Sequence, residues 1–362
     1  MSRVMDLSAS VGDAEQRLQA LIGMQALYVV QAKYEKVERA NAQAEELYKQ
    51  MQRTAPPFAG IYLAGAKLLQ GEIVEARERF DTILQAREDR RLQNLQEAQG
   101  MNFLVHGLAW NAHVLWCLGY PQAAIDSAQE AIDNAQAVIA SSHEIAQPFS
   151  QALAITYLAM LQNWQSDTSA FLAHAEEACA LTIEYKAPYY HAWANILRRF
   201  ARAEQRANSE TIADLHEAIQ RFTETGARAR LPVYHSLAAQ ACLKAGRYEE
   251  GLQALEQAQT ASLQNNERWW DAEIHRLRGE LLWAHDREPV AIEAEFQRAL
   301  AIARSQQARS LELRAAASLA RLWQTQARPT EAKQLLTEVY NWFTEGFDTL
   351  DLQAARALIA QL

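Results

Sequence analysis

The feature that most constrains this chain is a helical pattern of apolar residues running from Glu267 to Ala299. The segment reads ERWWDAEIHRLRGELLWAHDREPVAIEAEFQRA, with a polar break between His285 and Pro289. One apolar stripe precedes the break and a second one follows it, formed by Trp270, Ile274, Leu277 and Leu281, and by Ile292, Phe296, Ala299 and Leu300. A lone helical hairpin cannot bury a stripe on each arm, so the pattern predicts hairpins that stack on one another.

The composition supports a chain built of helices. Among its 362 residues, hydrophobic residues make up 49% and charged residues 22%, with only 13 glycines and 8 prolines. The most frequent residues are good helix formers, and alternating runs of β-branched residues are absent. A length of this size is long for one globular core but ordinary for a stacked array. We therefore expect an all-α fold.

The same kind of hairpin recurs along the chain. Ala76-x-x-x-Phe80 and Ala218-x-x-x-Phe222 follow the pattern of a tetratricopeptide second helix, in which a small residue admits the neighbouring helix and a ring fills the gap. A first helix is expected to begin after a cap at Asp13, with Leu18, Leu21, Ile22 and Tyr28 on its apolar face. The other expected helices are 34–51, 59–69, 104–118, 147–164, 168–182, 191–205, 209–222, 232–245, 248–261, 310–325 and 330–340. The charged run AREDRR at 86–91 is expected to extend the helix of Phe80 on a solvated face.

These patterns predict a tetratricopeptide-like right-handed superhelix of about eight helical hairpins with a C-terminal capping helix. Residues 1–12 are expected to form a flexible N-terminal leader, residues 13–347 the repeat array, and residues 348–362 the capping helix. The turn positions Ala32 and Gly71 lie 39 residues apart, and Gly71 and Gly119 lie 48 apart. Regular repeats of this type span about 34 residues, so the helices are expected to be longer than usual.

Charge and cysteine usage narrow the classes of partner. The net charge of −9 and the absence of a basic face argue against binding to nucleic acid. Cys117, Cys179 and Cys242 have no paired spacing, which favours reduced, buried thiols in a cytoplasmic protein. The N-terminus has no apolar signal core, and no segment approaches 18 consecutive apolar residues. We therefore expect no membrane association.

Three segments of the second half resemble a known family. ERWWDAEIHRLRGELLW, SLELRAAASLARLW and VYNWFTEGFDTLDLQAARALI resemble the C-terminal helical-repeat region of large bacterial signal-transduction proteins. AWNAHVLWCLGYPQAAIDSAQEAI, at 109–132, fits the same region more loosely. In those proteins the repeats follow a STAND-type regulatory ATPase, often fused to an adenylate or guanylate cyclase, a protein kinase or a LuxR-like DNA-binding domain. The resemblance implies a sensor arm that regulates an attached output.

The chain departs from that family in two respects. It has neither a G-x-x-x-x-G-K-[ST] phosphate loop nor the cyclase carboxylates, so nucleotide chemistry would belong to another segment or protein. In the fifth hairpin, Arg199 and Arg206 stand where the related regions usually carry glycines.

The candidate binding residues lie on the first helices of the last two hairpins, since first helices line the concave side of such stacks. They are Trp269, Glu273, Arg276, Glu280, Trp283, Arg314 and Arg321. Acids beside arginines, flanked by indoles, have the composition of a peptide-binding hot spot. In the alternative interpretation the charged residues only pair with one another, each pair contributing roughly 0.3–0.5 kcal/mol, and the indoles are packing residues.

Other groupings carry less weight. His106, Trp110, His113 and Cys117 share a helical stripe, and His113 and Cys117 are close enough in sequence to share a metal, but no HExxH or paired CxxC supports one. The pair Arg198-Arg199 is expected on the outer face of a helix. No nucleophile elbow or catalytic triad is apparent. We expect no cofactor, no metal and no enzymatic activity.

The sequence thus indicates a non-catalytic sensor or scaffold arm of a bacterial signal-transduction system, which binds a protein, peptide or other ligand on the concave face of the superhelix. An attached or separate ATPase or cyclase would be its output. Two alternatives stay open: an α/α-toroid carbohydrate-active enzyme and a purely structural self-assembly module.

Overall fold

The computed structural model describes residues 14–89, 102–141, 148–165 and 168–362. Its described part contains 17 α-helices, one short 3-10 helix and no strand. The hairpins are α2 (Ala14–Val30) with α3 (Tyr34–Gln50), α4 (Ile61–Gln70) with α5 (Ile73–Gln85), α7 (Phe103–Cys117) with α8 (Pro121–Ser141), α9 (Pro148–Gln165) with α10 (Thr168–Glu184), α11 (Pro188–Gln205) with α12 (Ser209–Glu224), α13 (Leu231–Lys244) with α14 (Tyr248–Asn265), α15 (Asp271–Ala284) with α16 (Pro289–Ser305), and α17 (Arg309–Thr325) with α18 (Pro329–Tyr340). A final helix, α19 (Leu350–Gln361), packs on α17 and α18.

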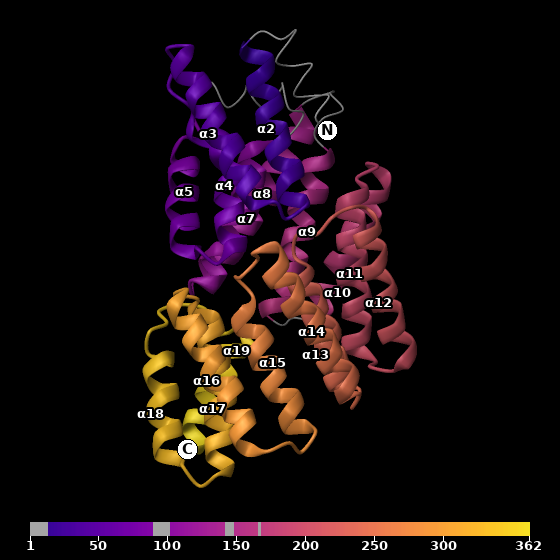
Figure 1. Ribbon diagram of the computed structural model, residues 1–362, viewed down its shortest axis with the longest axis vertical. Helices are drawn as coiled ribbons and strands as arrows, with labels where there is room; N and C mark the ends of the chain where they lie inside the picture. Colours follow the sequence, from indigo (N-terminus) through magenta and orange to yellow (C-terminus); the bar gives the residue numbers. More distant parts are fainter. Residues whose placement is uncertain (1–13, 90–101, 142–147, 166–167) are drawn as a thin grey trace.

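The prediction of an all-α, tetratricopeptide-like array of about eight hairpins is confirmed. Each first helix packs against its own second helix and against the first helix of the next hairpin. The first helices therefore form the inner layer of the array, and the second helices form the outer layer. Figure 1 shows the first three hairpins at the upper left, the middle three at the right and the last two with α19 at the lower left.

The small-residue and ring pattern has the packing role that the sequence indicated. Ala76 and Phe80 on α5 are fully buried, as is Phe222 on α12, and Ala218 is 3% exposed. An alanine on the second helix lets the neighbouring helix approach, and the ring four residues later fills the space beside it. The three cysteines are buried free thiols.

Successive turns of the superhelix touch at a repeating set of hydrogen bonds, which we name the inter-turn contacts. Each joins the C-terminal end of a first helix to the start of the first helix five hairpins later. The carbonyl of Val30 accepts from the amide of Arg228 (2.8 Å), that of Leu69 from the amide of Arg268 (2.8 Å), and that of Trp116 from the hydroxyl of Ser310 (2.5 Å). Carbonyls in the last turn of a helix have no partner within the helix. The inter-turn contacts supply those partners and hold hairpins 1, 2 and 3 against hairpins 6, 7 and 8.

Some helix boundaries differ from the expected ones. α15 begins at Asp271, because Arg268 and Trp269 form the turn that reaches back to Leu69. A 3-10 turn, η1 (Pro57–Gly60), precedes α4. α5 ends at Gln85, so the charged run at 86–91 does not extend it as a helix, and residues 90–91 lie outside the described residues. The expected leader at 1–12, Asp13 and Gln147 also lie outside them.

Candidate functional site

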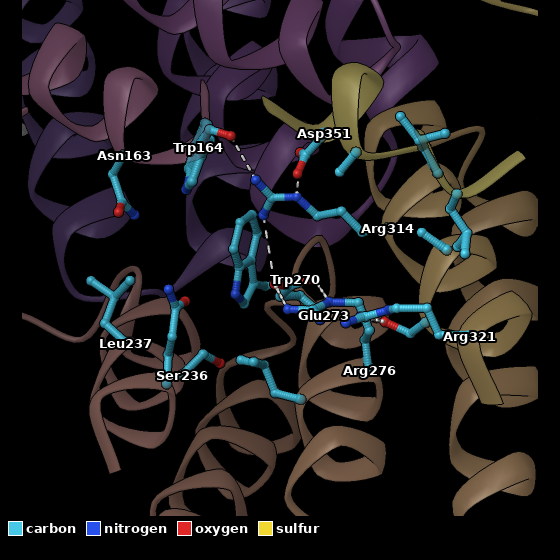
Figure 2. A pocket seen from close by; sticks show the side chains of 17 residues that line it. Asn163, Trp164, Ser236, Leu237, Trp270, Glu273, Arg276, Arg314, Arg321 and Asp351 are labelled. Atoms are coloured by element: carbon cyan, nitrogen blue, oxygen red, sulfur yellow. Dashed lines mark hydrogen bonds and ion pairs between the residues drawn. The ribbon is translucent and has the colours of Figure 1, made fainter. Parts of the chain in front are cut away.

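The inner layer encloses a cavity of about 340 Å³, which we name the inner pocket. Four first helices and the capping helix line it, so residues far apart in the sequence meet there (Figure 2). Its main side chains are Asn163 and Trp164 of α9, Ser236, Leu237 and Gln240 of α13, Trp270, Glu273, Arg276 and Leu277 at α15, Leu313, Arg314, Ser318 and Arg321 of α17, and Asp351 and Leu358 of α19. This volume lies in the usual range for ligand sites.

Arg314 joins three parts of the wall. Its Nε donates to Oδ2 of Asp351 (2.7 Å) and its Nη2 to the carbonyl of Trp164 (2.6 Å), which is near the end of α9. The guanidinium also lies 5.0 Å from the ring centre of Trp116, within the range of a cation–π contact. Arg314 therefore fastens the capping helix and the fourth hairpin to the eighth.

Glu273 and Arg276 form the buried charged pair of the pocket. Arg276 donates Nε and Nη2 to the two carboxylate oxygens of Glu273 at 2.8 and 2.7 Å, a bidentate arrangement. Burial alone would raise the pKa of Glu273, but the charge and hydrogen bonds of Arg276, with the nearby charge of Arg314, hold that pKa below its usual value. The carboxylate is consequently ionised and its charge is already compensated.

Glu280 links the two candidate helices. Its Oε1 accepts from the hydroxyl of Ser318 and from Nη2 of Arg321, both at 2.6 Å, and lies 3.4 Å from Nη1 of Arg276. Arg321 is the most exposed of these cations, with 49% of its side chain accessible. Three acids and three arginines therefore form one neutral network along the wall, as the pairing interpretation of the stripe requires.

The structure corrects the placement of the two candidate tryptophans. Trp269 is fully buried and donates its indole N–H to Glu267 (3.1 Å), because the residues before Asp271 are not helical and the stripe does not extend back to it. Trp283 packs edge-on against Phe296 and does not line the pocket. Trp270, expected only in the core, lines the pocket instead. Glu280 is not a lining residue but bonds to three that are, Arg276, Ser318 and Arg321.

Two amides in the pocket escaped the sequence argument. Asn163 and Gln240 line it, and neither side chain has a hydrogen-bond partner among the residues that the structure describes. Figure 2 shows Asn163 on the side of the pocket opposite Arg276 and Arg321. An amide offers both donors and an acceptor, which match a peptide backbone. Their role depends on contacts between separate hairpins, so no local pattern could have revealed it.

The histidine stripe of α7 faces inward, away from solvent. Nε2 of His113 lies 3.1 Å from the carbonyl of Tyr157, and burial together with the charge of Arg230 lowers the pKa of His113 to about 3. Burial raises the pKa of the Cys117 thiol. The two side chains are therefore neutral packing groups. Arg199, from the half-buried Arg198-Arg199 pair of the fifth hairpin, forms an ion pair with Asp214.

One cluster of possible metal ligands was not visible in the sequence, because its members come from three helices. The ligand atoms of His216, Cys242 and Glu250 all lie within 4.8 Å of one another. Nε of Arg247 lies 2.6 Å from the carboxylate of Glu250 and neutralises it. The other oxygen, Oε1 of Glu250, lies 3.6 Å from Nε2 of His216.

The comparisons with known proteins show the fold class. No family model and no curated protein sequence matches the chain significantly. Among solved structures, a Rap protein complexed with competence and sporulation factor is similar at 11% identity and a TM-score of 0.56, covering 97% of both chains. The Rap conjugation gene regulator of the plasmid pLS20, in complex with the Phr* peptide, is similar at 9% identity and 0.55, covering 95% of both.

A third structure, aspartyl phosphate phosphatase F from Bacillus subtilis, is similar at 12% identity and a TM-score of 0.51, covering 90% of this chain and 93% of that one. At such identities the likeness establishes the helical-repeat fold, in agreement with the hairpin count. Among the helices that the structure describes, none combines the length and apolar character that a membrane span requires.

Proposed function

We propose that this chain is a non-catalytic, peptide-binding arm that takes an extended peptide segment into the inner pocket. One observation carries the proposal: Asn163 and Gln240, whose amides have no hydrogen-bond partner among the described residues, line a cavity on the inner face whose charged groups already neutralise one another. Free amides beside satisfied charges favour a ligand held by its backbone. Two structures of similar fold contain a bound factor or peptide, which supports this ligand class.

The wall also suggests which side chains the peptide carries. The apolar lining residues are Trp164, Leu237, Trp270, Leu277, Leu313, Ala317, Ala354 and Leu358. Because the arginines and acids of the pocket are paired, a charged peptide side chain would have to break an existing ion pair to gain one. We therefore expect apolar or uncharged side chains at the positions that enter the pocket, with affinity coming from apolar burial and backbone hydrogen bonds.

The test is a peptide-display selection on the intact chain, followed by calorimetry of the enriched peptides. The double variant Asn163→Ala, Gln240→Ala should bind them about tenfold or more weakly, since two hydrogen bonds contribute about 0.5–1.5 kcal/mol each. Neither amide makes a hydrogen bond to another described residue, so the variant should unfold at the wild-type temperature. Gln257→Ala, at an exposed position of α14, is the matched control and should bind normally. Peptides that bind the double variant as well as the wild type would refute the site.

The family resemblance extends this proposal to bacterial signalling. We propose that the peptide-loaded arm acts on an output, an ATPase or cyclase carried by another segment or protein. If so, a selected peptide should change the amount of such an enzyme that the immobilised chain captures from the native cytosol, and should not do so with the double variant. Capture that is unaffected by the peptide would remove the signalling part of the proposal. A structural assembly module would instead show concentration-dependent self-association by sedimentation, without peptide.

A further inference from the structure

A second cavity, lined by other residues than the inner pocket, contains a buried arginine with a left-handed backbone. Arg230, the residue before α13, is 1% exposed and has a left-handed φ of +68°. Both carboxylate oxygens of Glu267 accept from its backbone amide at 2.9 Å. The adjacent amides of Arg228 and Ala229 bond to the carbonyl of Val30. A residue with this backbone conformation persists only where several contacts fix it, as the bonds to Glu267 and Val30 do here.

The guanidinium of Arg230 lies among aromatic rings and has no carboxylate partner among the described residues. Its central carbon is 4.5 Å from the ring centre of Trp110 and 4.4 Å from that of Trp193, and Nη2 donates to the hydroxyl of Tyr157 (3.0 Å). Its Nε has no hydrogen-bond partner. The oxygens of Glu267 accept from other donors, the Arg230 amide among them. A buried cation in this condition retains a strong capacity to bind an anion.

The space in front of this cation is a cavity of about 390 Å³, which we name the Arg230 pocket. Its walls are mostly apolar, formed by Ala26, Val29 and Val30 of α2, by Tyr62, and by Tyr190 at the start of α11. Leu27, which is 42% exposed, also borders it. An open apolar cavity with a few polar groups is the usual form of a small-molecule site.

One further polar atom in the wall has no partner. His106 lines the pocket at 5% exposure, and its Nδ1 makes no hydrogen bond among the described residues. Burial and the charge of Arg230 lower the pKa of His106 to about 3, so the ring is neutral near pH 7. A neutral imidazole can place a proton on Nδ1 and donate it to an oxygen of a ligand.

We propose that the Arg230 pocket binds a small carboxylic acid with an aromatic or aliphatic body. The carboxylate accepts hydrogen bonds from the guanidinium of Arg230 and from His106, and the apolar body fills the cavity beside α2. A single cation with few free donors suits a monoanion rather than a phosphate, which needs more. This inference is independent of peptide binding in the inner pocket, because the two cavities share no lining residue.

The test is calorimetric titration of the intact chain with three acids, 3-phenylpropanoate, indole-3-acetate and octanoate, each beside its corresponding alcohol. At least one acid should bind about tenfold or more tightly than its alcohol, because a hydrogen bond to a charged group contributes more than a neutral one. His106→Phe, which keeps a ring and loses both nitrogens, should weaken that acid several-fold and leave the alcohol unchanged.

Two further variants test the cavity without a substitution of Arg230, so that a folding defect at Arg230 does not affect the result. Ala26→Trp fills the cavity and should abolish acid binding, whereas Gln16→Trp, on an exposed part of the same helix, should not. The double variant Asn163→Ala, Gln240→Ala should bind the acid normally, which separates this inference from the proposed function. If no acid binds more tightly than its alcohol, or if Ala26→Trp binds as the wild type does, the inference is wrong.

Discussion

Two glycines with nearly the same backbone conformation allow the packing between superhelical turns to be measured. Gly119 and Gly226 both end a helix, with φ of +89° and +86°. A Cβ on Gly119 would lie 2.6 Å from the ring of Trp342 and 2.7 Å from Cβ of Arg309, both in the next turn of the superhelix. A Cβ on Gly226 would meet nothing within 4 Å. The two alanine variants therefore share the backbone strain and differ in the contact.

The expected magnitudes follow from these distances. Left-handed backbone costs a residue with a Cβ about 1–2 kcal/mol, so Gly226→Ala should lower the free energy of unfolding by about that amount. Gly119→Ala carries the same strain and adds overpacking, which typically costs about 1–3 kcal/mol. Its neighbour Arg309 contributes a Cβ, which cannot move aside as the end of a flexible side chain would. We expect a total of about 2–5 kcal/mol.

Urea denaturation followed by circular dichroism and by tryptophan fluorescence measures both variants against the wild type. We predict a lower urea midpoint for Gly119→Ala than for Gly226→Ala. Because both variants carry the same backbone strain, an error in the value assumed for it does not affect this difference. If the midpoints of Gly119→Ala and Gly226→Ala agree within the error of the measurement, the turns of the superhelix are not packed at Trp342 as described.

Burial raises the pKa of Glu267 to about 6 from 4.5, so between those pH values the folded state binds more protons than the unfolded state. The contribution of Glu267 to the free energy of unfolding should therefore fall by about 2 kcal/mol as the pH rises through this range. Glu267→Gln should lack this pH dependence in urea titrations at pH 4 to 7. Asp351→Asn, which weakens the contact with Arg314 Nε, should lower stability by roughly 1 kcal/mol and make α19 the first segment to lose protection from hydrogen exchange. All three thiols are buried, and burial raises the pKa of Cys242 to about 12. A thiol reagent at pH 8 should therefore modify none of them in the native chain. In 6 M guanidinium it should modify all three.

The arrangement of hairpins was predictable because each depends on a local pattern. The stripe of Ile274, Leu277 and Leu281 and the ring spacing of Ala76 and Phe80 identified helices that the structure contains. The period of the apolar residues and the positions of the turn residues depend on contacts between residues about four positions apart, which is about one turn of a helix. The number of hairpins and their stacking follow from those signals alone.

The site was predicted only in part, because its geometry depends on contacts between distant residues. Glu273, Arg276, Arg314 and Arg321 were identified since they lie on regular helix faces. Trp269 was misplaced since its turn is fixed by the carbonyl of Leu69, about 200 residues earlier in the chain. Helical spacing extrapolated backward from Glu273 contains no information about that partner.

The two pocket amides and the buried arginine were missed for a related reason. Asn163, Gln240 and Arg230 are ordinary polar residues in the sequence, and only their surroundings make them unusual. Whether a buried amide or guanidinium has a partner depends on every element that packs around it. A single sequence without three-dimensional contacts does not report this.

The hydrogen bonds at Val30, Leu69 and Trp116 also determine how this molecule can respond to a ligand. In an open solenoid the pitch of the superhelix can change through small rotations distributed over all the interfaces between repeats. In this chain the inter-turn contacts join hairpins that lie five repeats apart. A change in the pitch of the superhelix would therefore have to break the inter-turn contacts at Val30, Leu69 and Trp116.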